Sequence, residues 1–148
     1  MTQTFPIVPG DTRVLWSLLP AVVLILLVLA GVAVSLSAAR NARFEVSPIG
    51  LRLKGDLYGR FVPAANLQLD LARAVDLRTE PQLQAVRRTM GTATAGYQGG
   101  WFRLRNGEKA LLYVTDRSHV AYVPTTLGYA IMLSVADPEA FLASLRQR

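Results

Sequence analysis

The chain has 148 residues, with no cysteine, one histidine, and 16 lysine and arginine residues against 10 aspartate and glutamate residues. Without cysteine, disulfides, thiolate nucleophiles and cysteine-ligated metal sites are excluded. The formal net charge of +6 suits anionic partners as well as plain solubility, because the cations are scattered singly or in pairs and form no dense basic cluster.

Residues 14–36 form an uninterrupted apolar run, since no charged residue lies between Arg13 and Arg40. As an α-helix this run would extend about 35 Å, against roughly 30 Å of hydrocarbon in a bilayer. It predicts a single transmembrane helix over residues 13–37, with Trp16 as an interfacial anchor. The alternatives are a buried core helix and a cleaved signal peptide, whose apolar segments are usually shorter.

The predicted span divides the rest of the chain into three parts. Residues 1–12 form an N-terminal tail, residues 38–43 a short linker, and residues 44–148 one compact domain. The cations that follow the span, beginning with Arg40 and Arg43, outnumber those before it. The positive-inside rule therefore predicts a cytoplasmic C-terminal domain and an exported tail.

The first part of the domain shows a strand, turn, strand pattern. Residues 44–47 and 51–54 alternate apolar and polar side chains on either side of a turn at Pro48. A third extended segment, residues 58–62, ends at Pro63, because proline lacks the amide proton that a sheet interior needs.

The next two segments give weaker signals. Residues 66–77 fit a strand with a bulge, or a short amphipathic helix as the alternative. Residues 78–99 contain a run of small residues that cannot build a core. They predict an irregular, mobile loop flanked by short extended pieces.

The third part predicts an antiparallel meander joined by short turns. Its four strands are residues 101–105, 110–114, 119–123 and 129–135. Asn106 and Gly107 between the first two are typical of a tight hairpin turn, because they tolerate positive φ.

The chain ends with a helix signature. Asp137 is a suitable N-cap and Pro138 a suitable first helical residue, while Phe141, Leu142 and Leu145 give one apolar face. The expected fold is an N-terminal transmembrane α-helix followed by about seven antiparallel strands. The strands would form a curled sheet or open barrel, capped by the C-terminal α-helix.

The residues that could support catalysis or metal binding are few. His119 lies within a strand pattern, and Asp70 and Asp76 have no third ligand near them in the sequence, so structural or surface roles are favoured. The glycines match no phosphate-binding or dinucleotide motif. We therefore predict no enzyme activity, no cofactor, no metal and no nucleic-acid partner.

Four segments together resemble the bacterial PH (pleckstrin-homology-like) domains that follow membrane spans. They are FEVSPIGL (44–51), GGWFRL (99–104), LYVTD (112–116) and LSVADPEAF (133–141). These motifs consist of turns, core positions and a helix start. The resemblance implies a mainly-β, PH-like interaction domain at the inner membrane of a bacterial cell.

Two surfaces are candidates for binding. A protein partner at the membrane surface would use sheet edges and the 78–100 region, with Arg87, Arg88 and Trp101 as the main contacts. The alternative is recognition of lipid headgroups, because lipid-binding PH domains grip phosphates with cations on their first strands. The corresponding cations here are Arg52, Lys54 and Arg60. An uncharacterised enzyme is the least favoured alternative.

Overall fold

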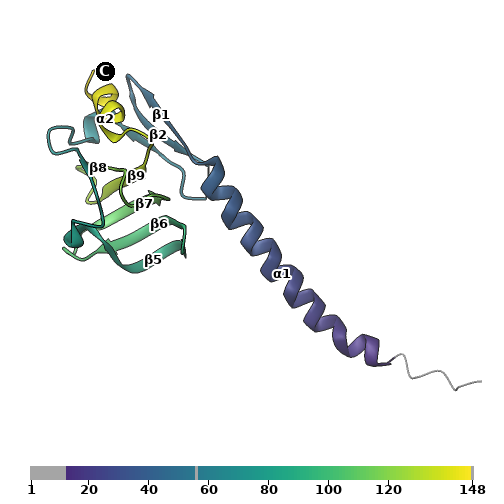
Figure 1. Cartoon of the computed structure of the whole chain (residues 1–148). Coiled ribbons are helices and arrows are strands. Elements are labelled where there is room, and N and C mark those ends of the chain that lie inside the picture. The colour runs from purple at the N-terminus through teal and green to yellow at the C-terminus, as the bar shows by residue number, and fades with distance from the viewer. Residues whose placement is uncertain (1–12, 56, 148) are drawn as a thin grey trace, which may run out of the picture. The chain divides into compact units, whose positions relative to one another are not determined.

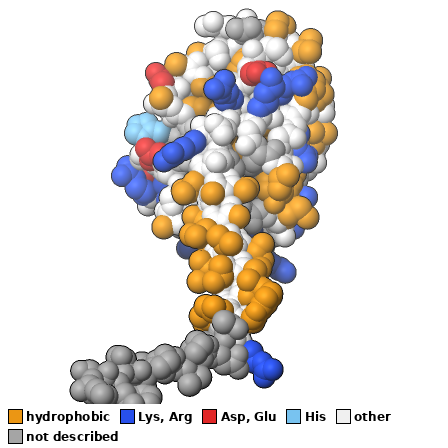
Figure 2. Space-filling model, turned by 90° about the vertical axis from the view of Figure 1, so that its right-hand side faces the viewer, with side chains coloured by type: hydrophobic (Ala, Val, Ile, Leu, Met, Phe, Trp, Pro, Cys, Tyr) orange, Lys and Arg blue, Asp and Glu red, His pale blue; other side chains and the backbone are white. Residues whose placement is uncertain are grey.

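The computed structural model describes residues 13–55 and 57–147, so the predicted tail, residues 1–12, lies outside the described residues. Helix α1 covers Arg13–Asn41 (Figure 1). Its stretch Leu15–Val34 has a mean hydropathy of 2.8 and is not buried by the rest of the protein. Figure 2 shows a predominantly hydrophobic surface along the helix. α1 thus has the length and composition of a membrane span, features that an N-terminal signal sequence can share.

α1 is longer than the predicted span. It continues as far as Asn41, so most of the predicted linker, residues 38–43, is helical. The segment after the apolar run contains neither glycine nor proline, and Arg40 in the last turn complements the negative end of the helix dipole. The chain divides into two compact units, residues 1–34 and residues 35–148.

The second unit begins with a three-stranded antiparallel sheet, which confirms the first two predicted extended segments; the third is shorter than predicted, because residues 57–60 form a turn and loop, and it includes Pro63. Its strands are β1 (Arg43–Ser47), β2 (Gly50–Lys54) and β3 (Phe61–Pro63), in the order β1-β2-β3. Gly50 starts β2 with φ +152°, and a Cβ there would lie 2.2 Å from the carbonyl oxygen of Val62. Only glycine allows β3 to approach this closely.

The second sheet has six strands, in the order β4-β8-β9-β7-β6-β5. They are β4 (Arg73–Val75), β5 (Ala85–Thr94), β6 (Tyr97–Leu104), β7 (Lys109–Val114), β8 (Val120–Pro124) and β9 (Ala130–Ser134). Short 3₁₀ turns cover Ala64–Asn66 and Pro81–Leu83. The mainly-β domain is confirmed, with nine strands in two sheets rather than about seven in one.

The prediction of an irregular loop over residues 78–99 is wrong. Ten of its residues form strand β5, and residues 97–99 begin β6. The two strands pair in a long hairpin, and β5 forms one edge of the six-stranded sheet (Figure 1). Most β5 side chains are exposed, so the strand has no alternation of buried and exposed residues that the sequence could reveal. Two of the glycines in this hairpin allow the backbones of β5 and β6 to approach closely. Gly91 of β5 is paired with Gly100 of β6, and both have positive φ.

The predicted hairpin at Asn106 and Gly107 is confirmed, with Gly107 at φ +88°. The prediction of a simple antiparallel meander is wrong, because β9 lies between β7 and β8 and pairs in parallel with β7. The four residues 130–133 of β9 are completely buried. A strand covered on both faces belongs in the centre of a sheet, where a parallel neighbour is common.

Residues 66–77 form neither the predicted bulged strand nor the alternative helix. Leu67 makes an isolated bridge to Thr125, a turn follows, and only β4 is regular. Leu67 is buried whereas the side chain of Leu71 is 61% exposed. The leucines that alternate in the sequence therefore do not share one face.

The core lies on both faces of the six-stranded sheet. Consecutive residues of β7 point to opposite sides: Leu111 packs with the first sheet and the C-terminal helix, and Leu112 packs with Phe102, Leu104 and other residues of a second cluster. The first cluster includes Leu51, Leu53, Val62, Ile131, Leu133, Leu142 and Leu145. The three-stranded sheet thus covers one face and is part of the domain.

Helix α2 (Pro138–Arg146) closes the fold, and its predicted cap is confirmed: Asp137 accepts a hydrogen bond from the Ala140 amide at 2.9 Å. Leu142 and Leu145 are buried against the first core cluster. Figure 1 shows α2 beside the three-stranded sheet, and it contacts β1, β4 and β8.

We expect Asp137→Ala to lower the free energy of unfolding by about 1 kcal/mol, because it leaves an amide at the helix start without its acceptor. Asp137→Asn keeps a side-chain oxygen and should lose less. Urea unfolding of the full chain in detergent, followed by circular dichroism, measures both. Equal losses in the two variants would show that the side-chain oxygen does not stabilise the helix.

Candidate interaction surface

Three of the predicted binding residues line one cavity. A space of about 310 Å³ lies between β2 and β3, lined by Arg52, Leu53, Lys54, Gly55, Gly59, Arg60 and Phe61. The loop that forms it is closed at its base, where the Leu53 amide donates to the Arg60 carbonyl at 2.8 Å. The structure therefore brings Arg52, Lys54 and Arg60 together at one loop.

The charges in this cavity are only partly neutralised. Lys54 Nζ lies 2.6 Å from Glu45 Oε1, and this hydrogen bond lowers the pKa of the Glu45 carboxyl. The Arg52 guanidinium lies over the Phe61 ring, 5.5 Å from its centroid. Neither Arg52 nor Arg60 forms an ion pair with a described acidic residue. Two cations remain available to an anionic group.

Trp101 joins this loop to the six-stranded sheet. The Arg60 guanidinium lies 4.6 Å and Lys109 Nζ 4.4 Å from the Trp101 ring centroid. Tyr129 meets the same ring edge-on, with 4.9 Å between centroids. Cation–π contacts of this kind stabilise by about 0.5 to 1 kcal/mol each when exposed. Trp101 is half-buried under these groups, so it holds the loop in place.

Arg87 and Arg88 lie apart from that cluster, on β5. Both are exposed, and no described acidic residue pairs with either. Arg87 stands directly across from Arg103 on β6. Like charges in such a cross-strand pair repel. Figure 2 shows basic side chains in separate groups over one face of the domain.

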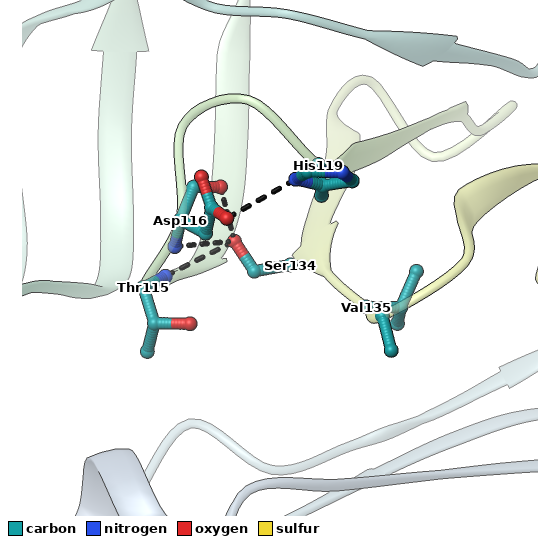
Figure 3. Close-up of a pocket in the computed structure, with 6 residues that line it drawn as sticks. Thr115, Asp116, His119, Ser134 and Val135 are labelled. Atoms are coloured by element: carbon teal, nitrogen blue, oxygen red, sulfur yellow. Dashed lines mark hydrogen bonds and ion pairs between the residues drawn. The ribbon is translucent and has the colours of Figure 1, made fainter.

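A second cavity, of about 350 Å³, lies beside the β7–β8 turn (Figure 3). Its walls include Asp116, His119 and Ser134. Ser134 Oγ accepts hydrogen bonds from the amides of Thr115 (3.1 Å) and Asp116 (3.0 Å) and donates to the Asp116 carbonyl at 2.7 Å. Ser134 therefore fixes the backbone of the turn.

The side chains of this turn do not form a catalytic relay. His119 Nδ1 lies 2.8 Å from Ser118 Oγ and 3.1 Å from Asp116 Oδ2. A serine–histidine–aspartate relay needs the hydroxyl and the carboxylate on opposite ring nitrogens, whereas both are on Nδ1 here. The described part of the chain also contains no group of three histidine or acidic residues placed to hold a metal ion.

Hydrogen bonds from the Ser118 side chain and amide, with a smaller contribution from His119, lower the pKa of Asp116 to about 2. A lowered carboxyl pKa stabilises the fold above the unfolded value near 3.8, and this stabilisation is lost as the pH falls through about 2. We expect the stability difference between the wild type and Asp116→Asn to be constant near neutrality and to shrink between these two values.

Thermal unfolding of both proteins across this pH range measures the difference. Ser118→Ala removes the hydrogen bond that lowers the pKa of Asp116 most. In that variant the loss of stability should therefore occur at a higher pH, closer to the pKa of Asp116 in the unfolded chain. A difference that does not change with pH would contradict the lowered pKa.

A family model described as "Bacterial PH domain" matches residues 70–148, more than half of the chain. The chain belongs to the bacterial PH domain family. No curated protein and no solved structure matches it. The resemblance noted in the sequence is thereby confirmed, and the PH domain suggests an interaction module.

The family match divides the candidate residues. Arg87, Arg88 and Trp101 lie within the matched PH region, which runs from shortly before β4 through α2. The cavity between β2 and β3 precedes it, although the core packs the two parts together. The residues that line this cavity therefore lie outside the part of the chain that the family model matches.

Lys109 and Tyr129 were not among the sequence-predicted site residues. Both contact Trp101, but they belong to β7 and to the turn before β9. Lys109 stands across from Arg103 in the predicted hairpin register, so its proximity to β6 was accessible to sequence reasoning. The position of Tyr129 beside Trp101 depends on the parallel pairing of β7 with β9, and no pattern in the neighbouring sequence indicates it.

Proposed function

We propose that this chain is a single-pass protein of the bacterial inner membrane whose cytoplasmic PH domain binds a partner protein at the membrane surface. The apolar length of α1 and its uncovered surface support the membrane span. The excess of cations after the span supports the orientation. The role is non-catalytic, in keeping with the geometry of the Asp116 turn.

The orientation is tested by a reporter fused to the C-terminus of the full chain. A reporter that is active only in the cytoplasm should be active, and one that is active only after export should be silent. The opposite pattern would place the domain outside the cytoplasm and contradict this part of the proposal.

The observation that carries the protein-binding proposal is the β5 edge, Ala85–Thr94. It is a ten-residue strand at the border of the sheet, and most of its side chains are exposed. One side of an edge strand offers unpaired amides and carbonyls to another strand. The guanidinium groups of Arg87 and Arg88, which form no ion pair with a described acidic residue, add positive charge to this edge.

The partner that fits this edge is an extended segment carrying acidic residues. Such a segment can add to the sheet as a further strand, with main-chain hydrogen bonds for affinity and side chains for specificity. Its carboxylates would relieve the repulsion between Arg87 and Arg103.

We expect a photoreactive residue at Val86, whose side chain is 56% exposed, to give a discrete cross-linked adduct in membranes of cells that contain the partner. Arg87→Glu with Arg88→Glu should abolish the adduct, because it places negative charge opposite the acidic segment. Gel mobility and mass spectrometry measure the adduct.

The matched control is Arg117→Glu. Arg117 is an exposed arginine beside Thr94, at the other end of the hairpin, so its reversal should leave the adduct unchanged. An adduct that survives the double reversal, or no adduct from any exposed β5 position, would refute this mode of binding.

A second candidate function is the sensing of lipid headgroups at the cytoplasmic leaflet. The cavity between β2 and β3, with Arg52, Lys54 and Arg60 in its wall, is the observation that favours it. Vesicles of anionic lipid should bind the domain, and more weakly at high salt.

A further inference from the structure

Three exposed cations form a row across the six-stranded sheet. Arg87 of β5 stands across from Arg103 of β6, and Arg103 stands across from Lys109 of β7. Residues paired in this way point to the same face of a sheet. Neighbouring strands lie about 4.8 Å apart, so the three side chains start within about 10 Å of one another. We call these three residues the basic row.

The basic row has no acidic counterpart in the described part of the chain. None of its three cations forms an ion pair with a described carboxylate. Arg103 Nη1 donates to the Gly107 carbonyl oxygen at 2.6 Å, which fixes the guanidinium without neutralising its charge. Glu108, next to Lys109 in the sequence, accepts hydrogen bonds from the Tyr122 hydroxyl instead. Like charges across a sheet repel each other, so an anion at this edge would stabilise the row.

Two bulges in β5 enclose Arg87 and Arg88. The register with β6 shifts on each side of this arginine pair, and Val86 and Thr89 are the extra residues. Bulges and charges at a sheet edge keep unrelated strands from adding to it. Arg88 is paired with the buried Phe102, so Arg88 points to the opposite face from Arg87. The edge therefore presents one cation to each face.

Beyond the second bulge the strand is regular. Residues 90–94 pair with residues 97–101 without a register shift. The side chains that follow Met90 in this stretch are those of glycine, threonine and alanine, and small side chains leave the outer backbone of an edge strand accessible. This stretch offers a partner five residues for main-chain pairing.

The charges decide which strand fits the edge. A second copy of this chain is a poor occupant, because pairing β5 with β5 would bring two further arginines to the edge. A carboxylate directly across from Arg87 would continue the basic row by one strand, about 5 Å from Arg87 and about 10 Å from Arg103 at the backbone. Salt screens charges over about 8 Å, so both arginines attract this carboxylate and Lys109 contributes little.

We propose that the partner segment carries two consecutive acidic residues, one facing Arg87 and the other Arg88, beside an extended stretch that pairs with residues 90–94. Consecutive residues of a strand point to opposite faces. An adjacent acidic pair therefore matches the two arginines, whereas two acidic residues separated by one residue share a face. The bulges and the repulsion within the basic row disfavour strands without the pair. The proposal rests on the β5 edge proposed above and adds the feature by which that edge selects its partner.

Synthetic peptides with blocked termini test this selection on the full chain in detergent. One peptide has Val-Thr-Val-Thr-Val followed by Glu-Glu, and a second has Glu-Glu before the same stretch, to cover parallel and antiparallel pairing. Comparison peptides carry Gln-Gln or Glu-Thr-Glu in place of Glu-Glu. The last of these keeps the charge but places both carboxylates on one face. Fluorescence anisotropy of labelled peptides measures each dissociation constant.

We expect the tighter of the two Glu-Glu peptides to bind about threefold more tightly than its Glu-Thr-Glu counterpart, because one exposed ion pair contributes roughly this factor. The Gln-Gln peptide should bind more weakly still. Arg87→Glu with Arg88→Glu should reverse the preference toward a Lys-Lys peptide, a gain that only a folded variant can show.

Arg103→Gln should weaken binding of the Glu-Glu peptide by about twofold at low salt, because it removes the second charge of the basic row. Arg43→Gln is the matched control. Arg43 is an exposed arginine of the other sheet, so its loss should leave the affinity unchanged.

Equal affinities for the Glu-Glu and Glu-Thr-Glu peptides would overturn the proposal, because total charge would then select the partner. Equal binding of the Gln-Gln peptide would overturn it in favour of a neutral strand. The Val86 adduct in cells separates these results from failure of the β5 edge itself. Its cross-linked segment, sequenced by mass spectrometry, should contain an adjacent acidic pair. An adduct without such a pair contradicts only the selection, whereas no adduct from β5 contradicts both proposals.

Discussion

Leu111→Ala and Leu112→Ala are each expected to lower the free energy of unfolding by about 2 to 5 kcal/mol. Both side chains are completely buried, so each truncation loses apolar burial and leaves a cavity. A loss of this size is a large part of the roughly 5 to 15 kcal/mol that stabilises a typical domain. Chemical unfolding of the full chain in detergent, followed by circular dichroism, measures both.

The comparison of these neighbours tests the two-sided core. In a sheet covered on one face only, one of two consecutive residues would point to solvent and its truncation would cost little. Leu71→Ala is the control, because an exposed leucine should change stability by only about 0.5 kcal/mol. A small loss at either Leu111 or Leu112 would show that one cluster does not pack as described.

Elements with local signals were predicted well. α2 was specified by Asp137 and Pro138, and the β6–β7 hairpin by Gly107, because caps and turns depend on residues close together in the sequence. The parallel pairing of β7 with β9 was missed, since the buried run in β9 shows that the strand is central but does not identify its neighbour.

The candidate surface was predicted only in part, for a related reason. Arg52 and Lys54 are on one strand, so their proximity follows from alternation. The stacking of Arg60 on Trp101 joins the β2–β3 loop to strand β6 of the other sheet, and such contacts depend on tertiary packing. The β5 edge was missed because an exposed strand has no hydrophobic period.

The β5 edge and the cavity between β2 and β3 are connected through β6. A Cβ at Gly100 would lie 3.2 Å from the ring of Tyr58, so the β2–β3 loop lies near β6. Gly100 is paired with Gly91 of β5. A partner strand bound along the β5 edge would therefore pass near the loop that forms the cavity of the second candidate function.

Gly100→Ala is expected to destabilise the β5–β6 hairpin by at least about 1 to 3 kcal/mol, the usual cost of a backbone conformation that side chains disfavour. Gly100 has φ +112°, and a Cβ there would lie 2.5 Å from the Met90 carbonyl oxygen and 2.7 Å from the Gly91 Cα. These are backbone atoms, so the strands must separate to admit a methyl group. Hydrogen exchange of the β5 and β6 amides, with chemical unfolding, measures the effect.

Gly96→Ala in the same hairpin is the matched control. Gly96 has no positive φ, and no atom of any residue beyond its two chain neighbours lies within 4 Å of the place where its Cβ would be. Alanine should be tolerated there, or should stabilise the domain by about 0.4 to 1 kcal/mol through a less flexible unfolded chain. If both variants unfold alike, the close approach of β5 to β6 is not what requires glycine at position 100. Gly100→Ala is compared with Gly96→Ala in both assays. If Gly100→Ala alone loses the hydrogen-exchange protection of the β5 and β6 amides and also loses the Val86 cross-link, an ordered β5 edge is necessary for partner binding.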